Sequence, residues 1–131
     1  MSPAARERII ELPATAAAAG MARRELASTP GIAGELGYKA LLMASEIIAV
    51  YVQDIEPGGG TMVRLSIFVS TARVRIEVGG GTPVAPPDVL LNSRETPSLG
   101  GMGLRIVDRM ADAWGVREAD GSAIWFELAR R

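Results

Sequence analysis

The chain has 131 residues, of which 48% are hydrophobic and 22% charged, so it is long enough to form one domain with a substantial core. Its 14 basic and 15 acidic residues give a net charge of −1, and no basic excess indicates binding to nucleic acid or to a membrane surface. Cysteine and histidine are both absent, which excludes disulfides, thiol nucleophiles, histidine acid–base chemistry and most transition-metal sites. No targeting or membrane-spanning stretch is visible, so we expect a soluble cytoplasmic protein.

The first part of the chain predicts one strand and two helices. Residues 6–12 alternate weakly and predict an edge strand that ends at Pro13. A helix is expected over residues 16–28, with Thr15 as its N-cap. A longer helix is expected over residues 33–55, with one buried stripe formed by Leu41, Leu42, Ser45, Ile48, Ala49 and Val52.

The second part predicts two hairpins separated by a loop and a helix. Residues 62–70 and 72–79 alternate cleanly, which is typical of strands with one covered face and one open face. A long loop follows to about Gly101, and a helix starts near Leu104. Strands over residues 114–118 and 122–128 flank Asp120-Gly121, a strong hairpin turn.

This order, β-α-α-β-β-loop-α-β-β, predicts an α/β two-layer sandwich. Its sheet is expected to be mixed or mostly antiparallel, with the helices on one face. We expect one domain over residues 1–131.

A glycine-rich junction precedes the third predicted helix. Gly100, Gly101 and Gly103 crowd this position, and the helix opens immediately after them. Free backbone N–H groups at such a junction can bind a phosphate, and glycine allows close approach of the anion. A tight loop before a packed helix is the alternative, and spacing alone favours it.

Several stretches resemble one known family. The order of elements, Ser45-Glu46-Ile47-Ile48 on the long helix, the Gly100–Leu104 junction and the ending Trp114-Gly115-Val116…Ile124–Leu128 are similar to the anti-sigma factor serine kinases. These belong to the GHKL ATPase superfamily (Bergerat fold), which includes the histidine kinases. The resemblance covers almost the whole chain and implies the histidine kinase-like ATPase fold.

The resemblance implies a catalytic carboxylate and a magnesium ligand on the long helix. Glu46 stands at the position of the family's catalytic glutamate, and Val50 stands where the family has an asparagine that holds Mg²⁺. A valine offers no oxygen to a hard cation. Gln53 and Asp54, about one turn further on, are the substitutes to consider, although their backbone is roughly 5 Å away. Alternatively, Glu46 is an exposed helix residue with no catalytic role.

The resemblance implies two further nucleotide contacts. Gly80 stands where the family has an aspartate that binds adenine, and glycine has no acceptor side chain. Glu77 is expected to be a solvated surface residue that does not replace this aspartate. The phosphate loop, Gly100, Gly101, Met102, Gly103 and Leu104, is retained.

These departures favour a degenerate member that regulates bacterial transcription by protein–protein binding. Its implied partner is a sigma factor or a STAS-domain anti-anti-sigma protein, and the family commonly forms homodimers. We expect no metal and no cofactor, and weak or absent kinase activity. The alternative is an active serine kinase that uses ATP and Mg²⁺, with Glu46 as base. A third interpretation is a small-molecule sensor whose Gly81–Gly101 loop closes on a ligand other than ATP.

Overall fold

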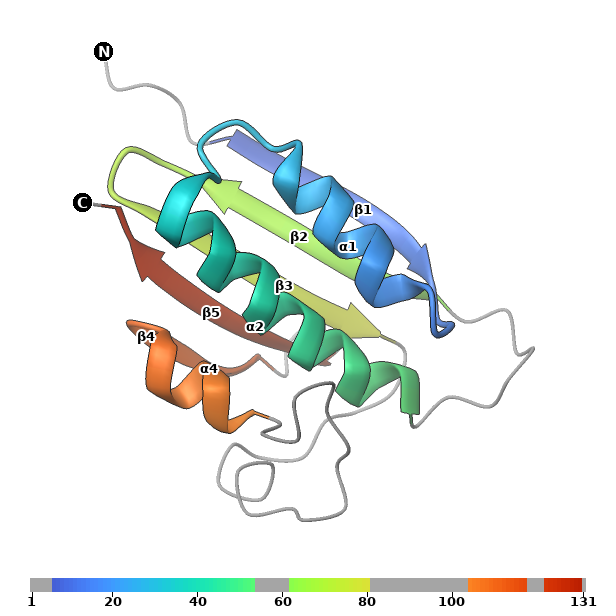
Figure 1. Cartoon of the computed structure of the whole chain (residues 1–131). Coiled ribbons are helices and arrows are strands. Elements are labelled where there is room, and N and C mark those ends of the chain that lie inside the picture. The colour runs from blue at the N-terminus through green and yellow to red at the C-terminus, as the bar shows by residue number, and fades with distance from the viewer. Residues whose placement is uncertain (1–5, 54–61, 81–103, 118–121, 131) are drawn as a thin grey trace.

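The computed structural model describes residues 6–53, 62–80, 104–117 and 122–130. In this part of the chain, helices form one layer against one face of a five-stranded sheet (Figure 1). The elements are, in chain order, β1 (Arg6–Pro13), α1 (Ala18–Ala27), α2 (Gly34–Gln53), β2 (Met62–Val69), β3 (Arg73–Gly80), α4 (Arg105–Met110), β4 (Ala113–Arg117) and β5 (Ser122–Ala129).

The strands lie in the order β1-β2-β3-β5-β4, and every neighbouring pair is antiparallel. β5 therefore lies between β3 and β4, although it follows both in the chain. Phe126 of β5 is opposite Ile76 of β3 on one side and Trp114 of β4 on the other. The predicted α/β class, the antiparallel sheet and the placement of helices on one face are confirmed.

The alternating strands bury one face of the sheet. Side chains facing the helices on β2, β3 and β5 are buried, whereas their sequence neighbours point to the face that carries no helix in the described structure. This is the pattern that the sequence predicts, because antiparallel sheets commonly have one packed and one solvated face. The buried residues of β2, β3 and β5 on the side of the helices are Val63, Leu65, Ile67, Val69, Val74, Ile76, Val78, Ile124, Phe126 and Leu128.

α2 is the central helix, and its buried surface is wider than the predicted stripe. It packs against α1, α4 and the sheet (Figure 1), so every residue from Met43 to Ile48 is buried. The stripe predicted through Leu41, Leu42 and Ala49 is wrong in detail, because these side chains are only partly buried. A single amphipathic stripe describes a helix with one packed face, whereas α2 has neighbours on three sides.

The start of α1 also differs from the prediction. Its N-cap is Ala17, and no side chain caps the helix. Thr15 instead closes a turn before the helix: its hydroxyl accepts a hydrogen bond from Ala17 N at 3.3 Å, and its carbonyl accepts one from Ala18 N at 3.0 Å. The helix consequently begins two residues later than predicted. None of the helices in the described ranges is long and apolar enough to cross a bilayer.

Candidate functional site

The elements expected to form the nucleotide site meet in the structure. α2 contacts both β3 and α4. In Figure 1 the second half of α2, the end of β3 and the start of α4 lie toward one end of the molecule. The fold therefore places Glu46 on the central helix of this region.

Glu46 is a core residue. Only 1% of it is exposed, so the interpretation as an exposed helix residue is wrong. Val50 lies four residues further along α2, about one turn toward the end of the helix. A buried carboxylate requires compensating polar interactions, which makes Glu46 unusual among its apolar neighbours on α2.

Next to Glu46, Ser45 links the two N-terminal helices. Its hydroxyl donates to Leu41 O at 2.7 Å and accepts a hydrogen bond from Arg23 Nη1 at 3.2 Å. Arg23 lies on α1, so this contact fixes α1 against α2. The observed role of Ser45 is thus packing between helices.

Only part of the predicted phosphate loop lies in the described structure. Leu104 is the N-cap residue of α4 and is 3% exposed, so it anchors the start of this helix in the core. Gly100, Gly101, Met102 and Gly103 lie outside the described residues, as does Asp54. The side chains of Val50 and Gln53 also lie outside them.

Gly80 is the last residue of β3 and pairs with Ser122 of β5. Its neighbour Gly79 pairs with Ala123 and, on the other side of β3, with Arg64. Successive residues of a strand point to opposite faces. The position at which the resembled family has an aspartate is therefore the end of a regular strand that pairs with β5.

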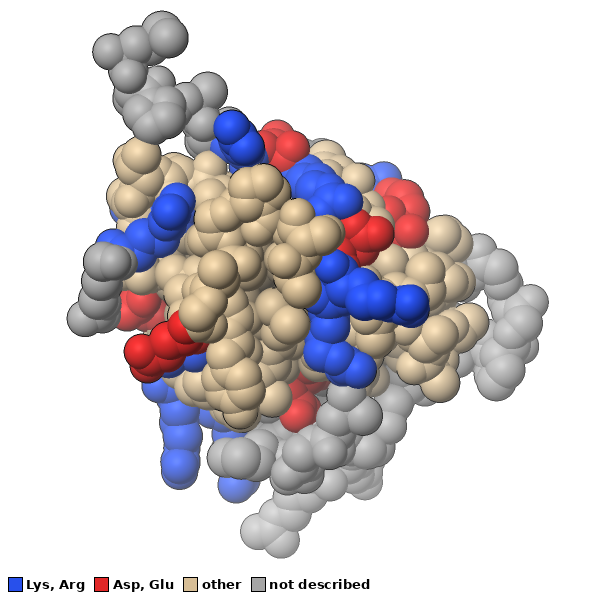
Figure 2. Space-filling model, turned by 45° about the horizontal axis from the view of Figure 1, so that its top comes forward, with Lys and Arg blue, Asp and Glu red and all other residues tan. Residues whose placement is uncertain are grey.

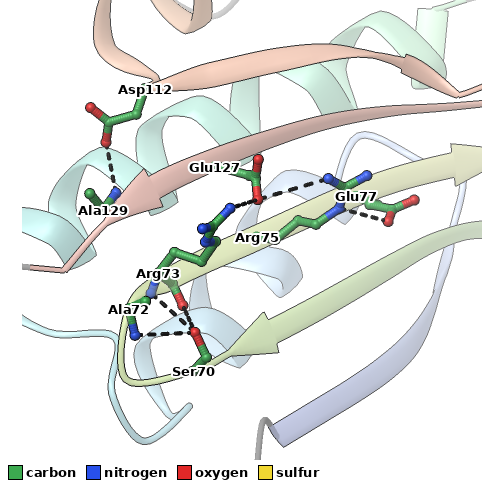
Figure 3. Close-up of polar contacts among 8 residues, drawn as sticks. All are labelled: Ser70, Ala72, Arg73, Arg75, Glu77, Asp112, Glu127 and Ala129. Carbon is green, nitrogen blue, oxygen red and sulfur yellow. Dashed lines mark hydrogen bonds and ion pairs between the residues drawn. The ribbon is translucent and has the colours of Figure 1, made fainter.

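A network of ion pairs covers the other face of the sheet (Figure 3). Glu127 lies 3.2 Å from Arg73 Nη1 and 3.9 Å from Arg75 Nη1, and Arg75 Nε lies 3.1 Å from Glu77. Glu77 also accepts a hydrogen bond from Arg117 Nε at 2.9 Å. Its side chain is only 12% exposed, so the expectation that Glu77 is a solvated residue is wrong.

Trp125 of β5 lies on this same face, opposite Glu77 of β3. The guanidinium carbon of Arg75 lies 4.3 Å from the centroid of the indole ring, a cation–π distance. Gly115 of β4 is opposite Trp125, and a Cβ at position 115 would lie 3.0 Å from Trp125 Cζ2. Glycine at this position leaves room for the ring to lie across the neighbouring strand.

Sequence reasoning missed this network. Alternation correctly assigned Arg73, Arg75 and Glu77 to the open face, but their partners come from β4 and β5. Cross-strand pairing depends on register, and register is set by the turn between β4 and β5 and by the position of β5 in the sheet. The only sign of this network in the sequence is the set of charged residues at the outward positions of the strands.

A comparison with protein-family models and with curated proteins finds no match to this chain.

Proposed function

We propose that this chain is an anti-sigma-factor-like regulatory protein that acts by binding another protein and has lost most of its nucleotide chemistry. Its partner is a sigma factor or a STAS-domain protein. The observation that carries the proposal is the pair Val50 and Gly80, two apolar residues at the positions where the resembled family needs a metal ligand and an adenine acceptor.

The architecture supports this proposal. The helical layer on an antiparallel sheet and the contacts of α2 with β3 and α4 agree with the expected fold. Gly80 pairs with Ser122 at the end of the ladder with β5, and as a glycine it places no acceptor side chain there. Phosphoryl transfer depends on Mg²⁺ to neutralise charge on the phosphates, and a valine at position 50 cannot hold it.

Nucleotide binding provides the first test. We expect neither ATP nor ADP at millimolar concentration, with or without Mg²⁺, to give heat in calorimetry or to raise the melting temperature. A ligand at a hundred times its Kd would add about 2.7 kcal/mol to the free energy of unfolding. Tight, Mg²⁺-dependent binding of ATP would contradict the proposal.

Restoring the missing groups provides a sharper test. The double variant Val50→Asn with Gly80→Asp is expected to gain Mg²⁺-dependent ATP binding that the wild type lacks. The matched control carries Val52→Asn and Gly79→Asp, which add the same groups to the same two elements at positions facing other directions. Equal behaviour of the two double variants would contradict the assignment of positions 50 and 80.

The kinase alternative rests on the retention of Glu46, a buried carboxylate on α2. Glu46→Gln keeps the size of the side chain and removes its basicity. If the chain is a kinase, this change abolishes phosphorylation of a STAS partner. Under the proposed function it leaves partner binding unchanged within a factor of about two, because binding does not use the carboxylate.

Partner binding is tested directly with the sigma factors and STAS proteins encoded in the same genome. We expect one of them to co-elute with the purified chain in size-exclusion chromatography without added nucleotide. The same experiment measures whether the chain forms a homodimer. If none of these proteins binds, the anti-sigma assignment fails whatever the result with ATP.

A further inference from the structure

A hollow of about 720 Å³ lies at the beginning of α2, beside the end of α4 and over the end of β5. Its lining includes three apolar side chains, Leu36, Met110 and Leu128. In Figure 1 this is the region where α2 begins next to the arrowhead of β5. It lies at the opposite end of α2 from Val50 and is separate from the proposed nucleotide positions.

Charged side chains of both signs also line the hollow. Lys39 and Glu35 come from α2, and Lys39 Nζ lies 3.6 Å from Glu35 Oε1. Asp112 and Arg130 come from the segments after α4 and β5. Figure 2 shows the same mixture more widely, with basic and acidic side chains interspersed on the face that it displays.

Backbone groups hold two of these charged side chains. Asp112 Oδ2 accepts a hydrogen bond from Ala129 N at 2.7 Å (Figure 3), and Arg130 Nη1 donates to Ser70 O at 2.8 Å. Arg130 also lies close to Gly31, where a Cβ would be 3.5 Å from its Nη1. These contacts hold the carboxylate of Asp112 and the guanidinium of Arg130 in place, and both side chains line the hollow.

The charge distribution restricts what can bind here. A lone anion would meet Glu35 and Asp112, and a lone cation would meet Lys39 and Arg130. A neutral apolar molecule would remove charged groups from water without replacing their interactions, which is costly. A ligand with both charges and an apolar body can contact the charged and the apolar side chains of the lining together.

We propose that this hollow binds a zwitterion with an apolar side chain, either a free amino acid or a short peptide. Its carboxylate interacts with Lys39 and Arg130, and its ammonium group with Glu35 and Asp112. Its apolar part covers Leu36, Met110 and Leu128. Volumes of roughly 300–1,000 Å³ are typical of small-molecule sites. This inference goes beyond the proposed function and does not depend on it.

The experiment compares matched ligands on the full chain by calorimetry. The ligands are leucine and the tripeptide alanyl-leucyl-alanine, each in its free form, with the amino group acetylated, and with the carboxylate amidated. We expect saturable binding of a free form and at least roughly tenfold weaker binding of each blocked form, because each block removes one charged interaction. The comparison of leucine with the tripeptide distinguishes the two ligand sources.

Two variants test which residues contact the carboxylate and the ammonium group of the ligand. Lys39→Met is expected to weaken binding of the free ligand by roughly tenfold. It should leave binding of the amidated ligand unchanged, since the amide lacks the carboxylate partner of Lys39. Glu35→Gln is expected to weaken binding of the free ligand by roughly tenfold and to leave binding of the acetylated ligand unchanged, since the acetylated ligand lacks the ammonium partner of Glu35. The control is Arg64→Met on β2, an exposed residue outside the hollow, which should leave all affinities unchanged.

Three outcomes would overturn the proposal. The first is the absence of saturable binding of every zwitterion at about 10 mM. The second is equal affinity for free and blocked ligands. The third is binding that Lys39→Met and Glu35→Gln both leave unchanged. None of these outcomes affects the nucleotide or sigma-factor tests, so the two proposals fail separately.

Discussion

Gly31 adopts a backbone conformation that other residues rarely adopt. Its φ is +93°, and a Cβ here would lie 2.8 Å from Val69 Cγ1. We expect Gly31→Ala to lower the free energy of unfolding by about 2–4 kcal/mol, from backbone strain together with overpacking against a stiff valine. Chemical denaturation monitored by circular dichroism measures this loss.

Gly34 provides the matched control. Its φ is +64°, but a Cβ there would meet no atom within 4 Å. Gly34→Ala should therefore cost only the conformational penalty, about 1–2 kcal/mol. If the two variants lose equal stability, the contact between Gly31 and Val69 does not matter. The packing of Gly31 against β2 is a tertiary contact, so local sequence patterns do not predict it.

Among the residues that the structure describes, Phe126 is the largest fully buried side chain. Phe126→Ala should cost roughly 3–5 kcal/mol, the range for a buried aromatic residue that leaves a cavity. Tyr38→Ala is the comparison, because Tyr38 is 66% exposed and its removal should change stability by no more than about 0.5 kcal/mol. Urea titrations of both variants test this, and a small loss for Phe126 would contradict the described core.

At the scale of elements, α4 depends on its surroundings. It has six residues, too few to be stable as an isolated helix. Leu104 and Val107 bury its inner face, and Trp114 Nε1 donates a hydrogen bond to Asp108 Oδ1 at 2.9 Å, which ties the helix to β4. We expect Asp108→Ala to lower stability by about 0.5–1.5 kcal/mol and to increase amide hydrogen exchange in α4 above that in α2.

Arg109→Ala is the control for this experiment, since Arg109 is an exposed residue of the same short helix. Equal exchange in the two variants would show that the indole contact does not hold α4. The sequence predicted this helix from its spacing, but it gave no sign of the Asp108–Trp114 contact, which depends on how the chain turns from α4 into β4.

The open face of the sheet is a second feature at this scale. Glu77 contacts both Arg75 and Arg117, so Glu77→Gln removes the charge that both guanidinium groups share. We expect a loss of about 1 kcal/mol at low ionic strength that becomes smaller in 1 M salt, since screening weakens partly exposed ion pairs. Glu11→Gln, at the more exposed pair with Arg64, should change stability less. A salt-independent loss at Glu77 would contradict an electrostatic origin.

Features that depend on local sequence pattern could be predicted, whereas features that depend on tertiary contacts could not. Alternation gave the buried faces of β2, β3 and β5 correctly, because the period of two depends only on the backbone. The burial of Glu46 was not predicted, since it depends on α1 and α4 packing on both sides of α2. The same holds for the hollow at Lys39 and Arg130, whose lining comes from segments far apart in the chain.

At the scale of the whole molecule, one continuous core joins the helices to the sheet. We therefore expect a single cooperative unfolding transition. Far-UV circular dichroism reports mainly on the helices, whereas the fluorescence of Trp114 and Trp125 reports on β4 and β5. The two signals should give the same midpoint in urea. An earlier fluorescence transition would show that this edge of the sheet unfolds separately.

The position of β5 has a consequence for how the chain folds as it is synthesised. β4 has β5 as its neighbour in the sheet, and β3 is flanked by β2 and β5. Both strands leave the ribosome before β5, so β3 keeps one edge unpaired and β4 remains without a sheet until β5 emerges. An unpaired edge can pair with another nascent chain. Pairing of β5 with β3 and β4 thus removes the unpaired edge. A ribosome that stalls before residue 122 leaves this edge open to aggregation.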